Sequence, residues 1–137
     1  MTATRPTRIG APGYTESLPC EAESARRARL LVSTALHTWG LPGLIETGTL
    51  LASELVTNAI RHSGSRSVHV SISRLTGDVV RIATTDGSPG MPAAHDAEAD
   101  DEGGRGLALV DTLADRWGTD LRPRGKTMWA ELTAGER

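Results

Sequence analysis

The chain has 137 residues and a formal net charge of −2, from 15 Lys and Arg and 17 Asp and Glu. This length suits one domain with a hydrophobic core and is too short for two, and the mixed, nearly balanced charge disfavours nucleic acid or an anionic membrane as a partner. Aromatic residues contribute only 3% and Phe is absent, so we expect an aliphatic core.

Cys20 and Lys126 are each the only residue of their type. A lone cysteine cannot form a disulfide within the chain, and Cys20 has no Cys or His nearby at metal-ligand spacing, so we interpret it as a structural thiol. The sequence contains no secretory or membrane-spanning pattern. We therefore expect a cytoplasmic protein.

The first 19 residues are rich in Pro and Gly and show little periodicity. This pattern predicts a flexible N-terminal arm over Met1–Pro19, with a short edge strand near Tyr14–Leu18. A single domain is expected over residues 20–137. It begins with an amphipathic helix over Glu21–Thr38, which Trp39-Gly40 ends.

A second amphipathic helix is predicted over Leu44–His62. Glu54 and Asn58, four residues apart, lie together at the edge of its apolar arc. There Asn58 can offer a neutral oxygen to a hard cation such as magnesium, and Glu54 can accept a proton from a nucleophile. On this stretch alone, an ordinary amphipathic helix with two polar rim residues is the favoured interpretation.

Alternation of apolar and polar residues predicts strands after the second helix. The segments Val68–Ile72 and Val80–Thr84 alternate on either side of a turn at Thr76-Gly77-Asp78, which is typical of an antiparallel hairpin. Two further strands are expected over Arg116–Asp120 and Lys126–Leu132, with a turn between them.

Asp86 follows the second of these strands and precedes a Gly-Ser-Pro-Gly run that must turn sharply. An acid at such a strand end is well placed to receive a ligand. Residues Met91–Gly103 carry several acids and no apolar periodicity, and we interpret them as a mobile, solvated loop. A calcium site is the alternative, but the spacing of the acids does not fit an EF-hand loop.

Gly103–Gly106 open a short predicted helix over Leu107–Ala114. Glycines at a helix start let backbone N–H groups approach an anion such as phosphate, although a flexible hinge explains them equally well. Gly125-Lys126-Thr127 ends like a Walker A loop, but Asp120 at its first glycine position, the internal Pro123 and the strand pattern that follows argue against a P-loop.

The order helix, helix, strand, strand, loop, short helix, strand, strand predicts the α+β fold class. We expect a two-layer α/β sandwich with helices on one face of a mostly antiparallel sheet. Three polar groups fall at successive element ends: Glu54 with Asn58, Asp86 with its turn, and Gly104–Gly106. The combination of all three groups indicates a function far more specifically than any one group does.

In order and approximate spacing, these groups resemble the N, G1 and G2 boxes of the GHKL ATPases, which include gyrase, Hsp90, histidine kinases and MutL. The stretches SELVTNAIRHS, DGSPGMP and GRGLALVDTLADRWG are similar to those of small single-domain kinases of the anti-sigma-factor type. The similarity covers about Glu21–Leu132 and implies the Bergerat fold.

The resemblance implies a role for each matching residue. Asn58 would ligate a magnesium ion that bridges the phosphates of ATP, and Glu54 would be the general base that activates a partner's serine or threonine hydroxyl. Asp86 would accept a hydrogen bond from the adenine amino group, where guanine offers a carbonyl. The other residues that the resemblance assigns to the nucleotide pocket are Arg61, His62, Ser88, Gly90, Gly104, Arg105, Gly106, Leu107 and Thr127.

Within this set, Gly104 and Gly106 would hold the phosphates, with backbone groups of Arg105 and Leu107 nearby. Residues 91–103 would be the ATP lid, and Thr127 would hydrogen-bond in the adenine pocket.

The match has weaker positions. Arg61 and His62 would at most line the pocket, and on spacing alone His62 is more often a helix-end histidine that interacts with the helix dipole than a catalytic group. Ser88 stands where the wider group has the middle glycine of D-x-G-x-G, which ends here at Gly90. Backbone freedom at that turn is therefore reduced.

The resemblance implies an ATP-binding, magnesium-dependent anti-sigma factor with serine/threonine protein kinase activity on an anti-anti-sigma (STAS-type) partner, in addition to binding a sigma factor. The alternative is a non-catalytic module that binds ATP and regulates transcription through nucleotide-dependent partner binding. Related kinases often act as homodimers, and we expect such an interface on the first helix and the N-terminal arm.

Overall fold

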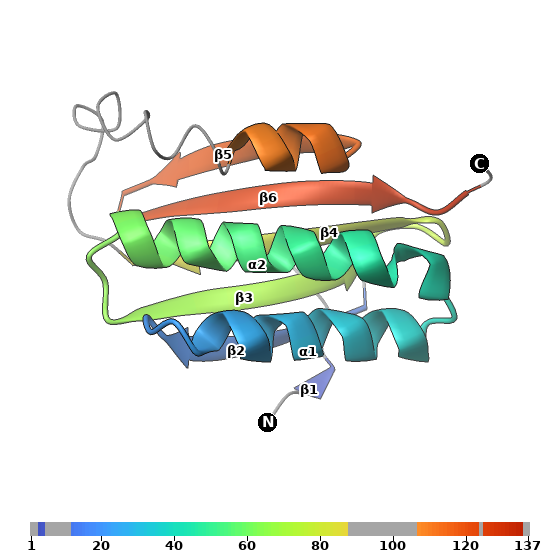
Figure 1. Cartoon of the computed structure of the whole chain (residues 1–137), viewed down its shortest axis with the longest axis horizontal. Helices are drawn as coiled ribbons and strands as arrows, with labels where there is room; N and C mark the ends of the chain where they lie inside the picture. The colour runs from blue at the N-terminus through green and yellow to red at the C-terminus, as the bar shows by residue number, and fades with distance from the viewer. Residues whose placement is uncertain (1–2, 5–11, 88–106, 124, 136–137) are drawn as a thin grey trace.

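The computed structural model of the chain describes residues 3–4, 12–87, 107–123 and 125–135. They form two layers, in which the helices cover one face of a single antiparallel sheet (Figure 1). The predicted fold class, a two-layer α+β sandwich, is confirmed.

The helices form where apolar residues recur at helical spacing. Helix α1 spans Ser24–Thr38 and α2 spans Ile45–His62, with a short 3-10 helix, η1, at Pro42–Leu44 between them. Helix α1 ends in a Schellman motif, because the Gly40 N–H donates to the His37 carbonyl and the Leu41 N–H to that of Leu36. Helix α2 begins one residue later than predicted and α1 three residues later.

A further helical segment covers residues 107–113, close to the predicted Leu107–Ala114. Val110 on its inner side is buried, and Leu107, Leu113 and Ala114 pack against the core. Among the described helices, none combines the length and the hydropathy needed to cross a bilayer.

Six strands form the sheet in the order β1-β2-β3-β4-β6-β5, and every neighbouring pair is antiparallel. Their bounds are Ala3–Thr4 (β1), Gly13–Pro19 (β2), Ser67–Arg74 (β3), Val79–Asp86 (β4), Arg116–Arg122 (β5) and Gly125–Thr133 (β6). The hairpins β3–β4 and β5–β6 are those predicted from the alternation of apolar residues. Strand β6 pairs with β4, so β5 lies at the edge of the sheet.

The N-terminal boundary of the folded domain differs from the predicted one. Strand β2 was predicted as a short edge strand within a flexible arm, but it pairs with β3 along its whole length, from Gly13 to Pro19, and β1 lies on its other side. Leu18 is 1% exposed and belongs to the core. The folded domain therefore includes residues 13–19, which the prediction placed outside it.

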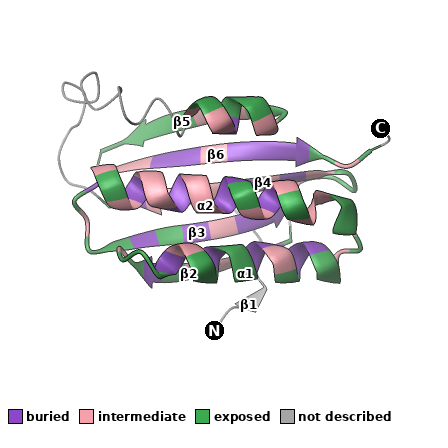
Figure 2. Ribbon diagram, in the orientation of Figure 1, coloured by how far each residue is buried: buried purple, intermediate pink, exposed green. Residues whose placement is uncertain are grey.

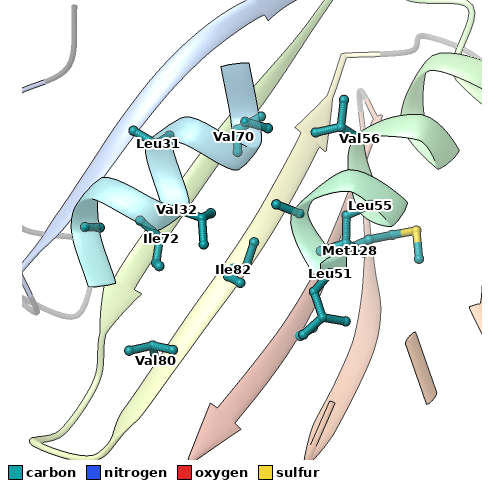
Figure 3. Packing of buried hydrophobic residues seen from close by; sticks show 14 of the residues in the cluster. Leu31, Val32, Leu51, Leu55, Val56, Val70, Ile72, Val80, Ile82 and Met128 are labelled. Carbon is teal, nitrogen blue, oxygen red and sulfur yellow. The ribbon is translucent and has the colours of Figure 1, made fainter. Parts of the chain in front are cut away.

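The core lies between the helices and the face of the sheet that they cover, here called the covered face (Figure 3). On this face the strands place residues such as Val70, Ile72 and Ile82, each at 0% exposure, in one core cluster with Val32 of α1 and Leu51 and Leu55 of α2. Phenylalanine is absent and these residues are aliphatic, as the composition predicted.

No helix of the described residues packs on the opposite side of the sheet, here called the open face (Figure 2). The alternation predicts exposed residues there, yet Glu131 is only 5% exposed. Its carboxylate accepts hydrogen bonds from Arg81 at 2.6 and 2.9 Å and lies 3.5 Å from an Arg116 nitrogen. Arg81 also stacks on the Trp129 ring, 4.2 Å from its centroid. Glu131 is thus buried by its own polar neighbours.

Candidate functional site

Three element ends meet at one end of the molecule. Helix α2 ends at His62, β4 ends at Asp86 and β6 begins at Gly125 there (left in Figure 1), whereas the helical segment 107–113 begins nearer the middle. Because consecutive elements of the sandwich run in opposite directions, residues far apart in sequence converge at this end. The motif residues that the structure describes lie on these elements.

On α2, Glu54 and Asn58 are half-buried, between fully buried neighbours such as Leu55 and Ala59 on the core side. This is the rim position predicted from the helical spacing. Within the described part of the chain, neither side chain takes part in a hydrogen bond or an ion pair. Their oxygens are therefore available to a ligand.

Asp86 is the last residue of β4 and is 4% exposed. It lies on the covered face, because it follows Val80, Ile82 and Thr84 in the alternation, all of them buried. Its cross-strand partners are Val68 on β3 and Lys126 on β6. A carboxylate thus stands in the same layer as the core, at the end of the sheet where α2 stops.

The end of α2 carries Arg61 and His62. Arg61 is exposed, whereas His62 is partly buried, and its Nε2 has no hydrogen-bond partner among the described residues. An imidazole nitrogen enclosed in this way suits a residue that lines a ligand pocket.

Thr127 lies differently from the expectation. It is the register partner of Thr85, so its side chain points to the open face, whereas Asp86 and Lys126 at the next position point to the covered face. Its hydroxyl is 2.9 Å from that of Thr85 and accepts a hydrogen bond from Arg122 Nε at 3.0 Å. The sheet thus separates this hydroxyl from the side where the Asp86 side chain lies.

Five predicted site residues lie outside the described residues, together with the predicted lid at 91–103: Ser88, Gly90, Gly104, Arg105 and Gly106. Their roles stay predictions. Leu107 is described, is partly buried and packs against the core.

The described residues contain no cluster of three or more His, Cys, Asp or Glu side chains that could hold a metal ion. The chemistry of the donors is compatible with magnesium that arrives with a nucleotide. Magnesium commonly keeps waters and phosphate oxygens and takes one or two protein oxygens, for which the amide of Asn58 is suitable.

One residue of this end was not singled out for the site from the sequence. Lys126 stands directly opposite Asp86, but only the pairing of β6 with β4 brings them together. The sequence indicates each strand and its faces, but it contains no local signal for that pairing.

A hollow of about 540 Å³ lies at the other end of the molecule, between the α1–α2 connection and the end of β6. Its lining includes Leu41, Thr47 and Leu132 and none of the residues predicted for the site. The motif residues and this hollow are therefore separate features.

Comparisons with known proteins support the family that the sequence motifs resemble. The chain matches the family of the histidine kinase-like ATPase domain over residues 18–132. It is also similar to an uncharacterized protein of Streptomyces coelicolor, with 36% identity over 87 residues, which cover 61% of this chain and 82% of that protein.

Among solved structures, the chain is similar to the crystal structure of the RsbU and RsbW domains of Rv1364c from Mycobacterium tuberculosis, with a TM-score of 0.67 and 20% identity. The match covers 90% of this chain and 32% of that protein, so the chain spans about a third of it. At this level of identity, the similarity shows a shared fold.

Proposed function

Because the chain belongs to the histidine kinase-like ATPase family, as the motifs indicated, we propose that it binds ATP at the end of the sandwich where α2, β4 and β6 meet. We further propose that it is an anti-sigma factor that phosphorylates a serine or threonine of an anti-anti-sigma, STAS-type partner. The sigma factor would be its second partner.

The observation that carries the proposal is the position of Asp86. A carboxylate that is 4% exposed on a mostly aliphatic face adds little to core packing, because burying charge costs free energy. Such burial is expected of a group that recognises a ligand. The ionised carboxylate can only accept hydrogen bonds, which suits the amino group of adenine.

Asn58 and Glu54 supply the remaining chemistry from α2. The Asn58 amide oxygen would hold magnesium, which neutralises charge on the phosphates. In the transfer, the bond between the γ-phosphorus and the β,γ-bridging oxygen breaks, and a bond from that phosphorus to the partner's hydroxyl oxygen forms. The hydroxyl proton passes to Glu54, and ADP leaves. Gly104, Arg105, Gly106 and Leu107 would supply the phosphate contacts.

The test separates nucleotide binding from phosphate transfer in one variant, Glu54→Gln. Calorimetric titration with ATP, with and without magnesium, should give magnesium-dependent binding that is within about twofold for wild type and variant, because Glu54 acts on the acceptor. Transfer of labelled γ-phosphate to purified STAS-type proteins should fall by about 100-fold or more in the variant.

Glu46→Gln is the matched control, because Glu46 is an exposed glutamate at the opposite end of the same helix. It should leave both measurements unchanged. Undiminished transfer by Glu54→Gln would remove the general-base role. Magnesium-dependent ATP binding without transfer to any partner would instead support the non-catalytic, ATP-gated binding module. Absence of ATP binding to the wild type would refute the proposal.

A further inference from the structure

Lys126, the only lysine in the chain, occupies a defined position beside Asp86. The two residues are direct register partners in the antiparallel β4–β6 pair. Side chains opposite each other in such a pair share one face, with Cβ atoms about 4.5–5.5 Å apart. Both therefore project from the covered face at the end where α2 stops.

The backbone on either side of this pair is tightly constrained. Gly125, just before Lys126, has a φ of 153°, and a Cβ atom there would overlap the carbonyl oxygen of Asp86. Only glycine permits this approach of β6 to β4. The start of β6 is therefore fixed against the end of β4, and the Lys126 side chain starts from a fixed point beside the Asp86 carboxylate.

The neighbours across the sheet show which side of the pair is open. In the same row, Val68 on β3 is 1% exposed, whereas Leu121 on β5, the other register partner of Lys126, is 66% exposed. Exposure thus rises along the row from Val68 through Asp86 and Lys126 to Leu121. This leaves the acid–base pair beside an accessible, partly apolar surface.

The pair offers complementary hydrogen-bonding groups. An ionised aspartate only accepts hydrogen bonds, and a lysine ammonium only donates them. The Watson–Crick edge of adenine presents the opposite combination on adjacent atoms: the 6-amino group donates and N1 accepts. Guanine reverses both, with an acceptor at O6 and a donor at N1.

From this juxtaposition we infer that Lys126 is a second specificity-determining residue of the nucleotide site, which donates a hydrogen bond to N1 of adenine while Asp86 accepts one from the 6-amino group. This inference rests on the proposed function, because it requires ATP in the same site. It adds a donor that rejects guanine, because guanine N1 carries a hydrogen atom that faces the ammonium.

The test compares Lys126→Met, which keeps the length of the side chain and removes the donor, with the wild type. Each protein is titrated with ATP and with 1-deaza-ATP, in which C–H replaces N1 and the 6-amino group remains. The wild type should bind 1-deaza-ATP about tenfold more weakly than ATP, since one charge-assisted hydrogen bond is lost. The variant should bind both equally, at about the affinity of the wild type for 1-deaza-ATP.

Two controls accompany this comparison. Arg122→Met removes an exposed cation that lies near the same sheet end but on the open face, and it should keep the discrimination of the wild type. Purine riboside triphosphate lacks the 6-amino group but keeps N1. Lys126→Met should still bind it more weakly than ATP, because Asp86 reads the amino group independently.

Discrimination against 1-deaza-ATP that is unchanged in Lys126→Met would overturn the inference. If that variant does not fold by circular dichroism, Lys126→Leu replaces it, and it should lose the discrimination in the same way because it also lacks the donor. Suppose that the wild type binds ATP, binds purine riboside triphosphate more weakly, and binds 1-deaza-ATP as tightly as ATP. That result would refute only the role of Lys126 and leave the proposed function standing. A wild type that binds no ATP would refute the proposed function itself.

Discussion

The two faces of the sheet bury side chains by different means. The covered face packs aliphatic residues such as Val70 and Ile82 under two helices, and each is 0% exposed. The open face has no helix over it, yet Glu131 there is 5% exposed, because Arg81 and Arg116 surround its carboxylate. Burial follows from exclusion of water on one face and from paired polar groups on the other.

This difference shows why Asp86 matters. On the open face, a buried acid is explained by the arginines beside it. On the covered face, Asp86 and Thr84 are polar residues in an aliphatic layer, and they lie toward the end of the sheet where α2 ends. We expect the Asp86 carboxylate to serve recognition, as proposed above, whereas the Glu131 carboxylate serves stability.

The largest expected effect is on the covered face. Ile82→Ala should lower the free energy of unfolding by about 3 kcal/mol, because it removes a fully buried side chain from the central strand and leaves a cavity. Ser71→Ala, on the open face of the neighbouring strand, should change it by less than about 0.5 kcal/mol. Urea unfolding followed by tryptophan fluorescence measures both. Equal losses would mean that the two faces do not differ as described.

A smaller loss is expected from Glu131→Gln on the open face. The variant keeps the shape of the side chain but removes the charge that the two arginines share, and we expect a loss of about 2 kcal/mol. Arg116 is well exposed, so water compensates part of the loss. The control is Glu23→Gln, whose pair with Arg26 spans 4.0 Å between two exposed side chains, and which should stay within about 0.5 kcal/mol. A negligible change in Glu131→Gln would show that the carboxylate is not needed on this face.

The smallest expected effect on stability is that of Thr127→Val, and its ATP affinity, compared with that of Asp86→Asn, shows which face of the sheet binds the nucleotide. Thr127→Val should lower the free energy of unfolding by about 1 kcal/mol, because Thr85 loses its hydrogen-bond partner. It should leave ATP affinity within about twofold, since its hydroxyl lies on the open face, whereas Asp86→Asn should weaken ATP by about tenfold or more. Calorimetric titration of both variants with ATP measures these affinities. Weak binding by Thr127→Val would return Thr127 to the adenine pocket.

Much of the fold was predictable from local patterns. The positions of α1, α2, β3, β4 and β6 follow from helical or alternating periodicity, which depends only on neighbouring residues. The prediction of a flexible arm was wrong in part. The short strand expected near Tyr14–Leu18 is longer, Gly13–Pro19, and the sheet stabilises it through β3. For the site, the rim positions of Glu54 and Asn58 were predictable from their spacing of four.

The sequence by itself determined which residues form helices and strands, which face of each is apolar, and that the motifs are those of a histidine kinase-like ATPase domain. Only the tertiary structure decided that β6 pairs with β4, that Lys126 stands opposite Asp86, and that Thr127 points away from it. The reason is physical. Periodicity is a local property of the chain, whereas strand pairing and register depend on contacts between segments that are 40 to 54 residues apart in the sequence, from Asp86–Lys126 to Val79–Thr133.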